Sequence, residues 1–231
     1  MSTCNMLLLS IGFFMGGTAM NGVSEHKLND QLAKYVSQRE TEFDMISAER
    51  KEQLNQLAGH IQKCRATEEP IRLTFICTHN SRRSHMSQLW AAVASVRYRI
   101  DRVETFSGGT EITAFNPRAV AALQFAGFEI EKLDETDNPR YRVFIAENVA
   151  PHICFSKYYS DEPNPATDYC AVMTCSAADI HCPNARGAKA RVAITYEDPK
   201  LADNSPDEVA QYAERSAQIA REMLYCFSLV Q

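Results

Sequence analysis

Residues 71–84 read IRLTFICTHNSRRS, and the rest of the chain is organised around this stretch. Its first six residues are mostly apolar or β-branched and contain no Gly or Pro, which is typical of a buried strand. Beyond it, apolar residues recur at a helical spacing, at Met86, Leu89, Trp90, Val93 and Val96. The sequence therefore predicts a strand, a short loop and the start of a helix in direct succession.

The short loop between this strand and helix has the pattern of an oxyanion site. Backbone N–H groups of a tight loop and the positive end of a helix dipole converge there on one point. Arg83 can add a bidentate hydrogen bond to two oxygens of the anion. The same field favours the thiolate form of Cys77, and the Ser84 hydroxyl can donate to that sulfur. Cys77 is therefore a candidate nucleophile, with a buried core thiol as the alternative.

The composition limits the class of partner. The 231 residues are enough for one α/β core with an appendage. A net charge of −5 without an extended basic stripe argues against nucleic acid. Eight cysteines without paired C-x-x-C motifs indicate a reducing compartment with a few reactive thiols. The cysteines that belong to no motif are expected to be structural: Cys4, Cys64, Cys154, Cys170 and Cys226.

Residues 1–25 form an apolar extension. Residues 6–20 resemble an export signal, but no Lys or Arg precedes them, and Gly12, Gly16 and Gly17 interrupt them. The run is also short for a membrane span. We therefore expect a cytoplasmic protein that binds no membrane, with export through this atypical signal as the alternative.

Residues 26–68 precede the first strand and contain two predicted helices. Their apolar stripes are Leu28, Leu32, Tyr35 and Val36, and then Ile46, Leu54, Leu57 and Ile61. Ser47 is the predicted N-cap of the second helix. Both helices are expected to pack on the outside of the core or against a partner subunit.

Strands and helices alternate in the middle of the chain. Residues 102–106 are a second predicted strand, and residues 117–126 are a helix that ends at Gly127. This order predicts a parallel sheet with helices on both faces. Because ligands bind beyond the carboxyl ends of such strands, residues 107–110 are expected to lie close to Cys77.

Residues 138–168 interrupt this alternation. Residues 141–146 and 152–155 are two short predicted strands, and a loop rich in Pro, Asn and Asp follows them. A small hairpin and a lid over the oxyanion site are both compatible with the pattern.

A second cysteine motif follows the strand predicted at residues 169–174. Cys175 ends this strand, and Cys182 comes seven residues later, directly before Pro183. Seven residues of helix are two turns, so the sulfurs would lie about 10 Å apart. A disulfide between them requires the segment to unwind, which a short Ala-rich helix permits at small cost. Two ordinary buried cysteines are the alternative.

The last predicted strand, residues 192–196, delivers Glu197, Asp198 and Pro199 to the same end of the sheet. Residues 205–208 read SPDE, a capping box with Pro206 at the first helical position. The closing helix is expected to bury Val209, Tyr212, Ile219, Met223, Leu224 and Phe227.

Residues 77–90, CTHNSRRSHMSQLW, resemble the phosphate loop of the low-molecular-weight protein tyrosine phosphatases and of the thioredoxin-coupled arsenate reductases that share their fold. The resemblance implies an α/β catalytic domain over residues 69–231, in three αβα layers around a central, mostly parallel four-stranded sheet. Residues 26–68 and 138–168 are then an N-terminal helical extension and a small insertion. The implied substrate-binding residues are Thr78, His79, Asn80, Ser81, Arg82, Arg83 and Ser84.

The arsenate reductases carry a cysteine at a strand end and a second one seven residues on, followed by Pro, and Cys175 and Cys182 match both. The resemblance implies a relay in which Cys77 attacks arsenate, Cys175 releases arsenite by forming a disulfide with Cys77, and Cys182 then attacks Cys175. Thioredoxin would reduce the final disulfide. No bound cofactor is implied.

Asp198 matches the general acid of both families. In the phosphatases aromatic residues commonly follow the Asp-Pro pair and hold the substrate ring, whereas residues 200–203 here read KLAD. This departure favours a small inorganic oxyanion. No metal is expected, because Gln88 stands where some arsenate reductases use a carboxylate to help bind potassium.

Three functions remain open. The first is an arsenate reductase with Cys77, Arg83, Cys175, Cys182 and Asp198 as catalytic residues. The second is a low-molecular-weight protein tyrosine phosphatase that hydrolyses phosphomonoesters through a phosphocysteine at Cys77. The third is a redox-sensing or arsenic-responsive binding module without turnover.

Overall fold

A computed structural model describes residues 26–181 and 185–230 of the chain. The predictions on residues 1–25, on Cys182 and on Pro183 lie outside the described residues. No helix in the described part is long and apolar enough to cross a membrane.

The centre of the fold is a four-stranded parallel sheet in the order β2-β1-β6-β7. Its strands are β1 (Ile71–Cys77), β2 (Val103–Gly109), β6 (Tyr169–Met173) and β7 (Ala188–Ala193). Strands β1 and β6 are almost completely buried, as expected of central strands covered on both faces. The sequence-based prediction of a parallel four-stranded sheet is confirmed.

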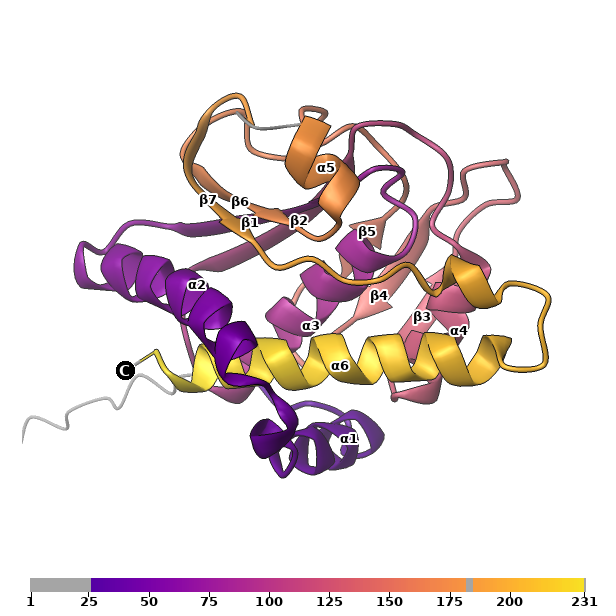
Figure 1. The fold of residues 1–231 in the computed structure, drawn as a ribbon, viewed down its shortest axis with the longest axis horizontal. Helices are drawn as coiled ribbons and strands as arrows, with labels where there is room; N and C mark the ends of the chain where they lie inside the picture. The colour runs from indigo at the N-terminus through magenta and orange to yellow at the C-terminus, as the bar shows by residue number, and fades with distance from the viewer. Residues whose placement is uncertain (1–25, 182–184, 231) are drawn as a thin grey trace, which may run out of the picture.

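Helices cover both faces of the sheet unequally (Figure 1). One face packs against α2 (Ala48–Ala66) and α3 (Arg83–Arg97), with α6 (Glu208–Ser228) lying across them. The other face carries the short helix α5 (Ser176–His181), which contacts β1 and β6. The αβα architecture is therefore confirmed, and its third layer is thin on the side of α5. Helix α4 (Pro117–Phe125) also packs against α6, and its chain reverses at Gly127, whose φ is +107°.

The two N-terminal helices are present as predicted. Helix α1 (Asp30–Glu40) buries Leu32 and Val36, and helix α2 buries Leu54, Leu57 and Ile61. The Ser47 side chain accepts a hydrogen bond from the backbone N–H of Arg50, which confirms the predicted N-cap. A 3-10 turn, η1 (Phe43–Met45), joins the helices, and both pack against α6.

A second, antiparallel sheet in the order β3-β4-β5 lies beside the main one. Strands β4 (Tyr141–Phe144) and β5 (His152–Cys154) form the hairpin that the sequence predicted within residues 138–168. Strand β3 (Glu129–Lys132) was not predicted, because its four residues are mostly exposed and charged and carry no buried apolar alternation.

Two predicted boundaries near the C-terminus are wrong. Strand β7 begins at Ala188 rather than Val192, because it is an edge strand whose alternate side chains are exposed and polar. It ends at Ala193, although the N–H groups of Ile194 and Tyr196 still donate to backbone carbonyls at the end of β6.

The closing helix starts later than its capping pattern predicted. Helix α6 begins at Glu208, because Ser205 accepts from the N–H of Asp207 and Glu208 accepts from the N–H of Asn204, so residues 204–207 form a turn. Val209 is 80% exposed rather than buried, since the buried stripe begins at Tyr212. A 3-10 helix, η2 (Pro199–Ala202), precedes this turn.

Candidate active site

The loop of residues 77–84, here called the oxyanion loop, joins β1 to α3 at the carboxyl edge of the sheet. The end of β2 runs directly beside it: Thr110 N–H donates to the Cys77 carbonyl at 3.3 Å, and Glu111 N–H donates to the Thr78 carbonyl at 2.8 Å. A Cβ atom on Gly109 would lie 2.7 Å from the Thr78 carbonyl oxygen and 2.8 Å from the Asn80 nitrogen. Only glycine permits this approach. The prediction that residues 107–110 lie close to Cys77 is confirmed.

The insertion also braces the oxyanion loop. Asn80 has a φ of +44°, and its side chain accepts from Lys157 N–H at 3.0 Å while donating to Ser84 Oγ at 2.9 Å. The Ser156 hydroxyl donates to the His79 carbonyl at 2.8 Å. These bonds attach residues 156–157 to the loop backbone, so this part of the insertion is a supporting wall. No local sequence pattern marks Ser156 or Lys157 for this role.

Cys77 lies at the floor of the loop. Its side chain is buried, and its sulfur is 3.1 Å from Ser84 Oγ, as the sequence predicted. No side chain caps α3 at Arg82, so the first-turn N–H groups of the helix are not satisfied by a side-chain cap. The partial positive charge of this helix end favours an anion next to the sulfur.

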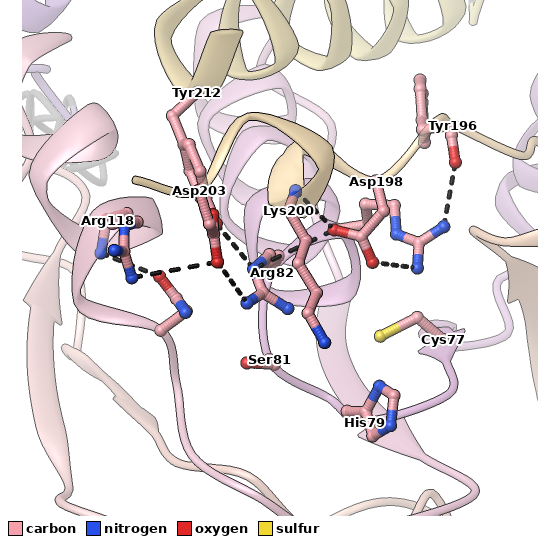
Figure 2. A network of polar contacts seen from close by, with 12 residues as sticks. Cys77, His79, Ser81, Arg82, Arg118, Tyr196, Asp198, Lys200, Asp203 and Tyr212 are labelled. Atoms are coloured by element: carbon pink, nitrogen blue, oxygen red, sulfur yellow. Dashed lines mark hydrogen bonds and ion pairs between the residues drawn. The ribbon is translucent and has the colours of Figure 1, made fainter. Parts of the chain in front are cut away.

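Arg83 pairs with Asp198, which Figure 2 shows near Cys77. Arg83 Nη2 donates to Asp198 Oδ2 at 2.6 Å, and Arg83 Nη1 donates to the Tyr196 carbonyl at 3.0 Å. The Nε atom of Arg83 is buried and has no hydrogen-bond partner in the structure. Asp198 Oδ1 accepts from Lys200 N–H at 3.1 Å, which places Asp198 as the N-cap of η2. The predicted acid and the predicted loop arginine thus share one ion pair.

Arg82 lies 3.9 Å from Asp198 Oδ1 through its Nε, but its hydrogen bonds go to other residues. Its Nε donates to the Tyr212 hydroxyl at 2.7 Å, and its Nη2 donates to Asp203 at 3.4 Å. The Tyr212 hydroxyl in turn donates to the other oxygen of Asp203 at 2.7 Å. Burial, together with this acceptor, raises the pKa of Tyr212 to about 12. Sequence reasoning predicted that Tyr212 is buried, but it missed the bonds of Tyr212 and Asp203 to Arg82 across a long sequence separation.

The remaining loop side chains line its rim and base. His79 Nε2 lies 3.1 Å from Glu111 Oε2, and the His79 side chain is 41% exposed. The Ser81 hydroxyl donates to the Ala114 carbonyl at 2.7 Å. A hollow of about 290 Å³ opens beside these residues, between the loop and Lys200. The structure therefore gathers all the predicted substrate-binding residues into one loop, and their contact with a substrate stays a prediction.

Cys175 lies at the adjacent strand end. Its sulfur is 3.5 Å from the Thr78 hydroxyl and accepts from Ala178 N–H at 3.3 Å. Cys175 therefore contacts the residue that directly follows Cys77 in the sequence. Cys182 lies outside the described residues.

The cysteines outside the motifs are buried, as expected of structural residues, and free of disulfides: Cys64, Cys154, Cys170 and Cys226. Burial raises the pKa of Cys154 and of Cys170 to about 12. Thiols of this kind stay protonated and are poor nucleophiles.

Among the described residues, no group of three or more His, Cys, Asp or Glu could hold a metal ion. Gln88 donates to the Thr105 carbonyl at 3.0 Å.

The chain is similar in sequence to an arsenate reductase from Halalkalibacterium halodurans, with 27% identity over 135 residues that cover 58% of this chain and 78% of the relative. A low-molecular-weight phosphotyrosine phosphatase from Vibrio cholerae O395 is a structural neighbour, with 12% identity, a TM-score of 0.45 and coverage of 67% of this chain and 93% of that one. An arsenate reductase in the phosphate-binding state is another, with 16% identity, a TM-score of 0.44 and coverage of 70% and 99%. No protein-family profile matches the chain.

Proposed function

We propose that this chain is an arsenate reductase that uses Cys77 as nucleophile, Cys175 and Cys182 as a redox pair, and thioredoxin as reductant. The observation that carries the proposal is the position of Cys175, whose sulfur touches the residue that follows Cys77. A hydrolase that works through Cys77 alone has no use for a second thiol at this place. The sequence similarity to a protein named arsenate reductase supports the same substrate.

The first step forms a bond between Cys77 and arsenic. The Cys77 thiolate attacks arsenate, and one oxygen accepts a proton and leaves as water. Asp198 is the proposed general acid that donates this proton. Arg83, which pairs with Asp198, would stabilise the charge that develops on the remaining oxygens. The buried and unpaired Nε of Arg83 offers a donor for one of them.

The second step reduces arsenic. The Cys175 thiolate attacks the Cys77 sulfur, the sulfur–arsenic bond breaks, and its electron pair remains on arsenic. Arsenite is released, and the two thiols are oxidised to a Cys77–Cys175 disulfide. Ala178 N–H donates to the Cys175 sulfur and the Thr78 hydroxyl lies 3.5 Å from it, so both groups hold the attacking sulfur at the strand end.

The third step regenerates the Cys77 thiolate. The Cys182 thiolate attacks Cys175, which frees Cys77 as a thiolate and forms the Cys175–Cys182 disulfide. The dithiol of thioredoxin then reduces this disulfide by exchange and becomes oxidised. Two electrons thus pass from thioredoxin to arsenic in each cycle.

The test is arsenate-dependent oxidation of NADPH in the presence of thioredoxin and thioredoxin reductase. We expect the wild-type chain to turn over and the variants Cys77→Ser, Cys175→Ser and Cys182→Ser each to lose at least about 1,000-fold in rate, because each removes one sulfur of the relay. Cys64→Ala, a buried cysteine outside the motifs, is the matched control and keeps wild-type turnover. Normal turnover by Cys182→Ser contradicts the relay.

Hydrolysis of phosphomonoesters is the second candidate, because the pairing of Arg83 with Asp198 beside Cys77 also suits a phosphocysteine mechanism. Asp198 would protonate the leaving alcohol and then activate water. Efficient hydrolysis that survives Cys175→Ala and Cys182→Ala would favour this function over arsenate reduction. A folded protein that is inert in both assays would favour the binding module.

A further inference from the structure

Arg50 of α2 is a partly buried cation that reaches the segment carrying Asp198. Its Nη2 donates to the Thr195 carbonyl at 2.6 Å, and its guanidinium carbon lies 4.9 Å from the centre of the Tyr196 ring. Its Nε lies 3.1 Å from Glu222 of α6, in a pair whose side chains are 15% and 4% exposed. A single side chain from the N-terminal helices thus holds one strand end and one core helix.

The Thr195–Tyr196 segment also contacts the active site. The Tyr196 carbonyl accepts from Arg83 Nη1 at 3.0 Å, and Asp198 follows two residues later and accepts from Arg83 Nη2. Arg50 and Arg83 therefore bind consecutive carbonyls of one segment, Arg50 from α2 and Arg83 from the oxyanion loop. The place of the Tyr196 carbonyl sets the position of the Arg83 guanidinium.

The Tyr196 side chain adds a second connection. The ring is buried between the sheet and the helices, and burial together with the charge of Glu222 raises the pKa of its hydroxyl well above the ordinary value. Tyr196 thus stays neutral, and the guanidinium of Arg50 lies over its face, an arrangement that attracts a cation to the ring. Arg50 therefore contacts both the backbone and the side chain of this segment.

We propose that Arg50 is a positioning residue for the active site, which makes helix α2 part of the catalytic unit. Arg50 orients the Thr195–Tyr196 segment, and this segment orients Arg83 toward the oxyanion and Asp198 toward its leaving oxygen. The inference rests on the proposed oxyanion chemistry of Cys77. Without Arg50, the oxyanion is bound more weakly and the bond-breaking step is slower, because hydrogen bonds to a charged ligand depend on placement within fractions of an ångström.

The test measures oxyanion binding without turnover. Iodoacetate alkylates Cys77, inorganic phosphate protects it, and mass spectrometry of the Cys77 peptide gives the half-protecting phosphate concentration. The variant Arg50→Met with Glu222→Gln removes the ion pair as a unit and leaves no unpaired buried carboxylate. Arg50→Lys keeps the charge but not the planar fork. Arg65→Met, an exposed arginine of the same helix, is the matched control.

We expect the half-protecting concentration to rise about 10-fold in the double variant and about 3-fold in Arg50→Lys, because one placed charge-assisted contact is weakened. Arg65→Met is expected to match the wild type. In turnover, KM should rise and kcat should fall in the same order of variants, while circular dichroism shows that they remain folded.

Three outcomes contradict the inference or the proposed site on which it rests. If phosphate protects the wild type and the folded Arg50 variants equally, Arg50 has only a structural role. If the double variant does not fold, Arg50→Lys decides the question, and unchanged protection in it overturns the inference. If phosphate fails to protect Cys77 in the wild type, the proposed oxyanion site itself is wrong.

Discussion

The two predicted redox sites at the carboxyl edge of the sheet are held very differently. The oxyanion loop, residues 77–84, is bonded to the end of β2, to the insertion and to its own helix α3. The segment after Cys175, helix α5, is short, and its residues Ser176, Ala177 and Ile180 are exposed. It is attached through the Cys175 bond to Ala178 N–H, the buried Ala178 side chain, and bonds from Arg191 to the carbonyl and the partly exposed carboxylate of Asp179.

This difference matches the chemistry proposed for each site. An oxyanion site needs donors that are already in place, because reorientation during the reaction would cost the stabilisation that they provide. A thiol that must attack first one sulfur and then be attacked by another needs a segment that opens at small cost. The comparison predicts large effects of substitution around the oxyanion loop and small ones in α5.

Gly109→Ala is expected to have the largest effect on the oxyanion loop. The added Cβ would lie within 3 Å of backbone atoms of Glu111, Thr78 and Asn80, so the loop or β2 must move. We expect a loss of about 3 kcal/mol in unfolding free energy and loss of phosphate protection of Cys77. Urea unfolding measures the first effect. Gly59→Ala in α2, where no atom lies near the new Cβ, is the control and should stabilise the chain by about 0.5–1 kcal/mol.

Asn80→Ala is expected to cost about 2–3 kcal/mol. It removes the bonds to Ser84 Oγ and Lys157 N–H and places alanine at a φ of +44°. Asn80→Gly removes the same bonds but tolerates this φ, so it should cost about 1 kcal/mol less. Urea unfolding of the two variants separates backbone strain from lost bonds. Equal losses would show that strain has no part in the effect.

Much of this site follows from local sequence patterns. The strand, loop and helix around Cys77, the Ser84 contact and the N-cap at Ser47 each depend on residues close together in the sequence. In such patterns the interacting residues stand near each other in the sequence, so the sequence alone predicts them correctly.

The parts that were missed depend on contacts between distant segments. Ser156 and Lys157 bind the oxyanion loop through backbone and hydroxyl groups, and Arg50 binds Thr195 across 145 positions. No periodicity or motif in the sequence predicts such bonds. The early start of β7 was missed because an edge strand needs only one buried face, and residues 188–193 carry charged side chains on the other.

The pH dependence of stability tests the rigidity of the region behind the loop. His85 of α3 is fully buried, its Nδ1 lies 3.0 Å from Ser107 Oγ, and burial, with Lys157 nearby, holds its pKa well below 6.5. The unfolded chain therefore binds one more proton than the folded chain as pH falls below 6.5. We expect stability to decrease by about 2 kcal/mol between pH 6.5 and 5 from this group.

Urea unfolding at several pH values measures this effect. His85→Gln has no titrating group at this position. Over this range, the slope of its unfolding free energy against pH should therefore be smaller than the wild-type slope by the contribution of one proton. Parallel pH profiles for the two proteins would show that His85 is protonated in the folded chain, and that the interior behind the loop admits a charge.

The smallest expected effect comes from α5 and gives the most direct comparison of the two regions. Ile180 is 71% exposed, whereas Ile76, which precedes Cys77, is fully buried. Ile180→Ser should change the unfolding free energy by about 0.5 kcal/mol or less, and Ile76→Ser should cost about 3–5 kcal/mol, since only the second leaves a cavity in a packed core. Native-state hydrogen exchange should show α5 amides opening at a free energy well below that of β1 amides. Equal opening free energies would mean that α5 unfolds only with the whole domain, and the Cys175 thiol would then lack the local freedom that the relay requires.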